Sequence, residues 1–130
     1  MSEGRVHADL VIDAKKNRLR IYKTTLHELG DPKYIQLLVD PDQRNLVIVA
    51  VDRKRSGDQT VLIGNSINKP GSSCEIYSGV FIGKLCEITT GMEPGHTYRL
   101  KGEIIPSQGI ASFNLDMFEM IQQKGEQDGA

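Results

Sequence analysis

Lysine and arginine side chains gather in two short stretches of the sequence, and these residue types suggest a chemical task. Cations that share one face of a protein contact nucleic-acid phosphates, because several of them together supply the affinity. Acidic residues gather instead near the C-terminus, so charge is asymmetric along a chain whose formal net charge is -1. We therefore take as candidate phosphate contacts Lys15, Lys16, Arg18, Arg20, Arg53, Lys54 and Arg55.

The same cations also have a structural explanation. Lysines on outer strands keep one sheet edge from pairing with another, and a solvated sheet face is rich in charge. Nucleic-acid-binding surfaces usually add exposed aromatic rings or a recognition helix, and the sequence shows neither. The solvated face is therefore the favoured interpretation, and phosphate binding stays open as the alternative.

No other group of residues predicts a catalytic site. His7, His27 and His96 have no spacing that would gather them around a metal ion. Residues 79–84 resemble a phosphate-binding loop but place three residues, not four, before the Gly-Lys pair. Residues 40–45 lack the central glycine and final glutamate of a calcium loop. We therefore expect no enzymatic activity, no metal and no cofactor.

The composition is that of one ordinary globular domain. A chain of 130 residues can close a single core, and 38% hydrophobic and 25% charged residues are far from a disordered composition. No apolar run approaches the roughly 20 residues of a membrane-spanning helix. The cysteines, Cys74 and Cys86, match no redox or zinc pattern, which favours a reducing compartment. We expect a cytoplasmic protein without a membrane partner.

Alternating apolar residues predict two β-hairpins in the first half of the chain. Residues 6–12 and 18–22 form the first, and residues 34–39 and 46–51 form the second around a turn rich in Asp, Pro and Asn. The uninterrupted apolar run Val47–Val51 predicts a central strand that is covered on both faces.

A short helix is expected between these hairpins. Thr25 and Glu28 have the spacing of a capping box at its start, and Gly30 suits its C-terminal cap. The second half repeats this order, because a strand at residues 74–77 leads into a helix capped by Ser78. The elements expected after that helix are a hairpin over 98–105 and 110–115, a short C-terminal helix over 117–123, and a disordered tail over 124–130.

The whole predicts a single α+β domain over residues 1–123 that is β-rich. Its order of strand, helix and hairpin occurs twice, which predicts an internal duplication. Chance is the competing explanation, because strand pairs joined by turns that contain proline are common and little else matches residue for residue.

With two such units, the chain resembles one domain of the DNA sliding clamps, the ring-forming processivity factors of replication. The resemblance covers roughly residues 6–115 and consists of the order of elements. It implies an oligomeric protein whose basic helices face DNA. The predicted helices carry little positive charge beyond Lys23 and Lys84, so no clamp residue is transferred to this chain. A saddle similar to the TATA-binding protein is a second resemblance of the same kind.

Two functions therefore stand as hypotheses. The first is a non-enzymatic accessory binding module in DNA metabolism or gene regulation, clamp-like and oligomeric, with DNA as its partner. The alternative is a homo-oligomeric adaptor that binds protein, either itself or another chain, through a sheet edge or an apolar groove.

Overall fold

The computed structural model describes residues 4–53, 60–63 and 71–121. They form a β-rich α+β fold on one antiparallel sheet of eight strands in the order β5-β3-β4-β8-β7-β1-β2-β6. The strands are β1 Val6–Asp13, β2 Arg18–Tyr22, β3 Tyr34–Asp40, β4 Asn45–Val51, β5 Thr60–Leu62, β6 Ser73–Tyr77, β7 Thr97–Ile105 and β8 Ile110–Ile121. The helices are α1 Lys23–Glu28 and α3 Gly79–Ile88, with a 3-10 turn, η1, at Pro106–Gln108.

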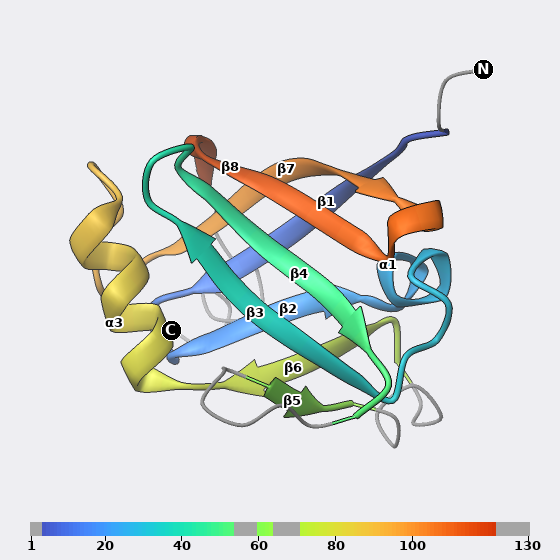
Figure 1. Cartoon of the computed structure of the whole chain (residues 1–130). Helices are drawn as coiled ribbons and strands as arrows, with labels where there is room; N and C mark the ends of the chain where they lie inside the picture. The colour runs from blue at the N-terminus through green and yellow to red at the C-terminus, as the bar shows by residue number, and fades with distance from the viewer. Residues whose placement is uncertain (1–3, 54–59, 64–70, 122–130) are drawn as a thin grey trace.

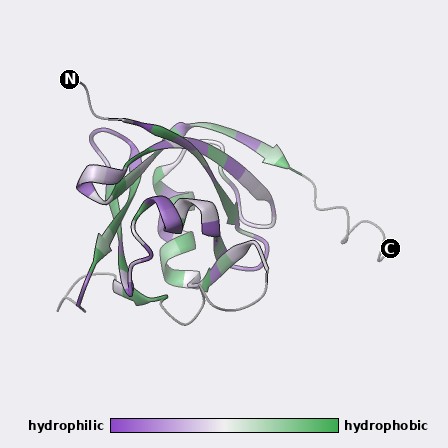
Figure 2. Ribbon diagram, turned by 90° about the vertical axis from the view of Figure 1, so that its right-hand side faces the viewer, coloured by the Kyte–Doolittle hydropathy of each residue, from purple (hydrophilic) through white to green (hydrophobic). Residues whose placement is uncertain are grey.

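The sheet curls into a half-barrel around its own apolar face (Figure 1). Helix α3 lies at one end of the curl and α1 at the other, and Figure 2 looks along the curl from the α1 side. Alternate residues of the inner strands point into the hollow, since successive side chains of a strand point to opposite faces. The core that results is made of fully buried side chains from the sheet and both helices, among them Ile12, Ile21, Leu26, Ile48, Leu85 and Phe113.

All three predicted hairpins are confirmed. β1 pairs with β2, β3 pairs with β4, and β7 pairs with β8, each in antiparallel register. The apolar run Val47–Val51 belongs to β4, an inner strand between β3 and β8. Its expected burial on both faces is wrong, because Ile48 is fully buried whereas Val47 and Val49 are half-buried on the outer face.

The predicted cap of α3 is confirmed, and that of α1 is partly wrong. The Ser78 hydroxyl accepts a hydrogen bond from the backbone N–H of Phe81 at 3.2 Å, which satisfies a free donor at the helix start. Helix α1 begins earlier than the expected capping box, so Thr25 lies buried inside the helix. Gly30 follows the helix with a φ of +91°, the left-handed conformation that suits glycine there.

The predicted C-terminal helix is wrong. Residues Met117–Ile121 belong to β8, where Phe118–Ile121 pair with Thr97–Leu100 of β7. Their apolar spacing also fits a helix, but pairing with a strand some 20 residues earlier supplies the backbone hydrogen bonds. The expected tail over 124–130 lies outside the described residues. Within the described ranges, no helix has the length and apolar character needed to cross a membrane.

Candidate functional site

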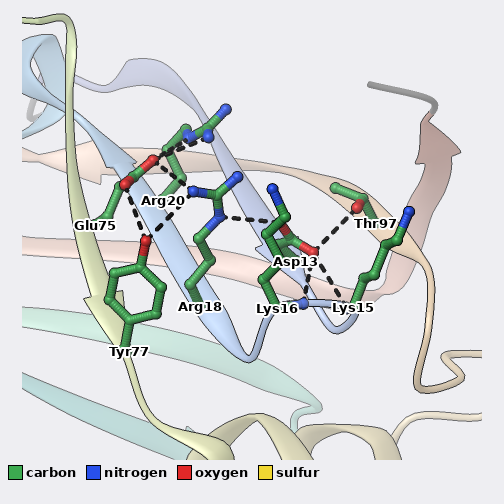
Figure 3. Close-up of polar contacts among 8 residues, drawn as sticks. All are labelled: Asp13, Lys15, Lys16, Arg18, Arg20, Glu75, Tyr77 and Thr97. Carbon is green, nitrogen blue, oxygen red and sulfur yellow. Dashed lines mark hydrogen bonds and ion pairs between the residues drawn. The ribbon is translucent and has the colours of Figure 1, made fainter. Parts of the chain in front are cut away.

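Asp13 organises the turn between β1 and β2. It ends β1 and is 0% exposed. Its Oδ1 accepts hydrogen bonds from the backbone N–H groups of Lys15 at 3.1 Å and Lys16 at 3.0 Å. The Thr97 hydroxyl on β7 donates to the same oxygen at 3.3 Å, and Arg18 Nε donates to Oδ2 at 2.9 Å (Figure 3). One buried carboxylate therefore fixes the turn and ties it to β7.

Arg18 extends this network to β6. The residue is 8% exposed, and its Nη1 donates to Glu75 Oε2 at 3.1 Å and to the Tyr77 hydroxyl at 3.5 Å. Burial lowers the pKa of Arg18, but hydrogen bonds to Tyr77 and Asp13 and the charges of Glu75 and Asp13 outweigh it, so the net shift is upward. The guanidinium is charged, and that charge is balanced inside the fold.

Arg20 pairs with the same carboxylate from the solvent side. It lies directly opposite Glu75 in the β2–β6 register, and its Nε and Nη2 donate to Oε2 at 3.2 and 2.9 Å. About a quarter of the Arg20 side chain and a third of the Glu75 side chain are exposed. The arginines Arg18 and Arg20 and the carboxylates Asp13 and Glu75 thus form one charge-balanced network, drawn in Figure 3.

The structure brings four of the predicted phosphate contacts together and separates a fifth. Lys15 and Lys16 are exposed on the turn that Asp13 holds, beside Arg18 and Arg20. Arg53 is exposed just after β4, and three strands separate β4 from β2 across the sheet. The end of β4 and the start of β2 also lie at opposite ends of the half-barrel (Figure 1). Lys54 and Arg55 lie outside the described residues.

The histidines occupy separate places in the described structure. His27 pairs with Asp31 one turn later, beyond α1, and His96 makes an edge contact with Tyr98 at 6.4 Å between ring centroids. In the part of the chain that the structure describes, no group of three His, Cys, Asp or Glu side chains could hold a metal ion. Cys86 on α3 is half-buried, and burial raises the pKa of its thiol, which lowers its thiolate fraction at neutral pH.

The end of β8 forms a second candidate site, which the sequence interpretation missed. Strand β4 pairs with β8 only as far as Asn114, and the last backbone bond between them runs from Leu115 N–H to the Arg44 carbonyl at 2.8 Å. Residues Asp116–Ile121, here termed the β8 arm, continue past β4, and within the arm Phe118–Ile121 pair with β7. The Asp116 carboxylate at the start of the arm accepts a hydrogen bond from Arg44 Nε. Among the described residues, the other edge of the arm has no strand beside it.

The β8 arm exposes apolar side chains along this edge. Met117 is 67% and Met120 is 62% exposed. Phe118 is half-buried, where its ring meets the edge of Tyr98 at 5.2 Å between centroids. A pocket of about 300 Å³ lies at the base of the arm, lined by Arg99, Lys101, Met117, Phe118 and Glu119. Figure 2 shows the end of this strand reaching out from the body of the molecule.

A local irregularity in the β7–β8 pairing lies where the arm begins. Gly102 of β7 is opposite Phe113, and two residues earlier Leu100 is opposite Phe118. The four residues 114–117 of β8 therefore face the single residue Lys101 of β7. Extra residues on one strand bend it and increase its twist. The bulge thus separates the part of β8 that pairs with both β4 and β7 from the end of the arm, which pairs with β7.

Comparison with known proteins assigns the chain to no family. The chain matches no known family model, and no curated protein or solved structure matches it significantly. The fold defines the chain as a β-rich α+β protein with a curled antiparallel sheet. Its resemblance to sliding clamps stays a prediction.

Proposed function

We propose that this chain is a homo-oligomeric adaptor, a non-enzymatic binding module that associates with a second copy of itself through the β8 arm. The observation that carries the proposal is an apolar strand end that, within the described ranges, has no strand along one of its edges. Such an edge presents backbone N–H and C=O groups that can accept a further strand, and apolar side chains along it give that pairing a hydrophobic contribution.

The two outermost strands of the sheet, β5 and β6, are poorer docking surfaces. Strand β5 has three residues, and short edge strands are a common protection against unwanted pairing. Strand β6 carries Glu75 at its centre within the ion-pair network. The β8 arm instead places Met117 and Met120 in solvent, side chains that adapt well to a binding surface. This contrast supports the arm as the docking edge.

Charging the arm is expected to separate the oligomer. A Met120→Lys variant would bring an ammonium group into the contact, and we expect it to weaken self-association by about 2 kcal/mol or more, roughly 30-fold. Because Met120 is exposed in the single chain, the free energy of unfolding should change by only about 0.5 kcal/mol. Sedimentation equilibrium over a range of concentrations measures the association constant.

Val80→Lys is the matched control for this experiment. Val80 is the most exposed large apolar side chain described, at 82%, and it lies on α3 rather than on the arm. The control should associate like the wild-type protein. A wild-type protein that is monomeric at high micromolar concentration, or a Val80→Lys effect as large as that of Met120→Lys, contradicts the proposal.

A clamp-like accessory module that binds DNA is the second candidate. Its support is the Asp13-anchored turn, which presents Lys15 and Lys16 to solvent beside Arg20. The duplication that belongs to this candidate stays a prediction, because the strands that open the two proposed units, β2 and β6, lie side by side at one end of the sheet. The hairpins β3-β4 and β8-β7 meet at the centre of the sheet in mirrored order, with β5 beside β3 and β1 beside β7.

Charge reversal on the turn tests DNA binding. If the lysines bind phosphates, the double variant Lys15→Glu, Lys16→Glu should bind duplex DNA much more weakly at low salt. The slope of log affinity against log salt should also fall by about 0.9 for each phosphate that the variant no longer neutralises. Fluorescence anisotropy with a labelled duplex measures both quantities. Lys84→Glu on the exposed face of α3 is the control, and equal binding by both variants and the wild type argues against this candidate.

A further inference from the structure

The β8 arm has two faces of different character, and they limit how a second copy can pair with it. Phe118 lies opposite Leu100 and Met120 lies opposite Tyr98 in the β7–β8 register, and both partners on β7 are buried. Phe118 and Met120 therefore share the core-side face of the arm. Alternation places Met117, Glu119 and Ile121 on the other face.

Symmetry restricts the register of two such arms further. When a two-fold axis perpendicular to the sheet relates two antiparallel strands, residues that lie opposite each other point to the same face. One residue of the arm therefore lies on the axis, opposite the same residue of the second copy. Its neighbours then pair at equal distances on either side. The arm thus offers only a few registers, one for each residue that can occupy the axis.

We propose that two copies of this chain pair their β8 arms antiparallel with Glu119 on the two-fold axis, an inference that rests on the proposed function. This register places Phe118 opposite Met120 of the second copy and Met117 opposite its Ile121. Every apolar side chain from Met117 to Ile121 then faces another apolar side chain across the new strand pair, the arrangement that stabilises adjacent strands. The pairing closes on itself, so it gives a dimer and not a filament.

The alternative registers oppose carboxylates to apolar side chains. An axis at Phe118 sets Glu119 against Met117 and Asp116 against Met120. An axis at Met117 sets Glu119 against Leu115, and an axis at Met120 sets it against Ile121. Each of these sets a carboxylate against an apolar side chain, where it loses water and keeps only the partner in its own chain, Arg99 for Glu119 and Arg44 for Asp116. That desolvation costs more than an apolar pair of the same area.

The charge of the proposed register is balanced by β7. Two Glu119 side chains meet at the axis, and like charges directly opposite are unfavourable by themselves. Arg99 lies opposite Glu119 on β7, with its Nη1 3.7 Å from Glu119 Oε1. The dimer therefore carries a row of Arg99, Glu119, Glu119 and Arg99, whose charges sum to zero across the four strands.

Disulfide trapping locates the axis. In a Cys86→Ser background, single cysteines are placed by Met117→Cys, Phe118→Cys, Glu119→Cys and Met120→Cys, and the full-length proteins are oxidised mildly. Directly opposite Cβ atoms are about 4.5–5.5 Å apart, close enough for a disulfide after a small shift, whereas diagonal ones are about 7–8 Å apart. We expect Glu119→Cys to form a covalent dimer on the order of tenfold faster than the other variants.

The outcomes separate this inference from the proposal beneath it. Fastest cross-linking at position 119 supports the register. Fastest cross-linking at 117, 118 or 120 overturns the register and leaves the adaptor proposal standing. The inference is also overturned if the wild-type protein is a dimer but none of the four cysteine variants cross-links, because the contact then lies elsewhere. A monomeric wild-type protein in sedimentation overturns the adaptor proposal itself.

Discussion

Replacing Asp13 by alanine is expected to lower the free energy of unfolding by about 3 kcal/mol, because the change removes one partner of a buried ion pair and leaves Arg18 with only the partly exposed Glu75. Arg18 is 8% exposed and would lose its 2.9 Å bond to Oδ2 while remaining ionised. The same substitution removes the acceptor for the Thr97 hydroxyl on β7, which is also buried. Removing one partner of a buried ion pair costs more than the pair itself contributes.

Urea unfolding followed by circular dichroism measures this loss, and Arg20→Ala provides the comparison. Arg20 is part of the same network, but its side chain and that of Glu75 are about a quarter and a third exposed. Water can therefore solvate the Glu75 carboxylate after the change, and we expect a loss of about 1 kcal/mol or less. Equal losses for the two variants would show that the burial of Asp13 does not govern its contribution.

An Asp13→Asn variant distinguishes charge from shape. The amide oxygen can still accept hydrogen bonds from the turn, so the backbone of Lys15 and Lys16 stays anchored. The guanidinium of Arg18 loses the buried one of its two counter-charges in this variant as it does with alanine, and keeps Glu75 at 3.1 Å. We expect a loss between those of Arg20→Ala and Asp13→Ala, with the difference from alanine reporting the hydrogen bonds of the turn.

Features that depend on neighbouring residues were predictable from the sequence. The hairpin of β1 and β2 follows from alternating apolar residues, and the turn between them closes with Asn17 at a φ of +55°, a conformation that asparagine tolerates. The cap of α3 follows from Ser78, whose hydroxyl accepts a hydrogen bond from the backbone N–H of Phe81, three residues later. In each case the physical cause lies within a few residues of its effect.

Features that depend on strand register were not predictable in this way. The apolar spacing of residues 117–121 fits a helix as well as a strand, and only pairing with Thr97–Leu100 decides between them. The neutralisation of Arg18 and Arg20 likewise depends on Glu75, which is 57 and 55 residues away in the sequence. The basic stretch therefore suggested a larger cationic surface than the fold provides at this turn.

The order of strands across the sheet was not predictable from local sequence patterns either. Strand β8 lies between β4 and β7, and its last residues extend past the end of β4. This arrangement creates the β8 arm. The sequence of residues 116–121 does not indicate where the neighbouring strand β4 ends. The candidate docking edge is consequently a property of topology, visible only when both hairpins are in place.

Gly102→Ala is the second change for which we expect a large loss of stability, about 3 kcal/mol, which is the upper part of the range for overpacked cores. A Cβ atom at position 102 would lie 2.1 Å from the Ser112 carbonyl oxygen and 2.5 Å from Phe113 Cδ2. The first of these is backbone in the β7–β8 ladder, and the second belongs to a fully buried ring. Neither can move without disturbing the β7–β8 pairing next to the bulge.

Gly83→Ala is the matched control, because it adds the same methyl group where nothing lies within 4 Å. Position 83 is exposed in the interior of α3, where alanine in place of glycine should raise the free energy of unfolding by roughly 0.5–1 kcal/mol. Thermal and urea unfolding of both variants therefore give shifts of opposite sign. Two losses of similar size, or a Gly102→Ala protein as stable as the wild type, would show that β7 and β8 do not approach as closely at the bulge as the register requires.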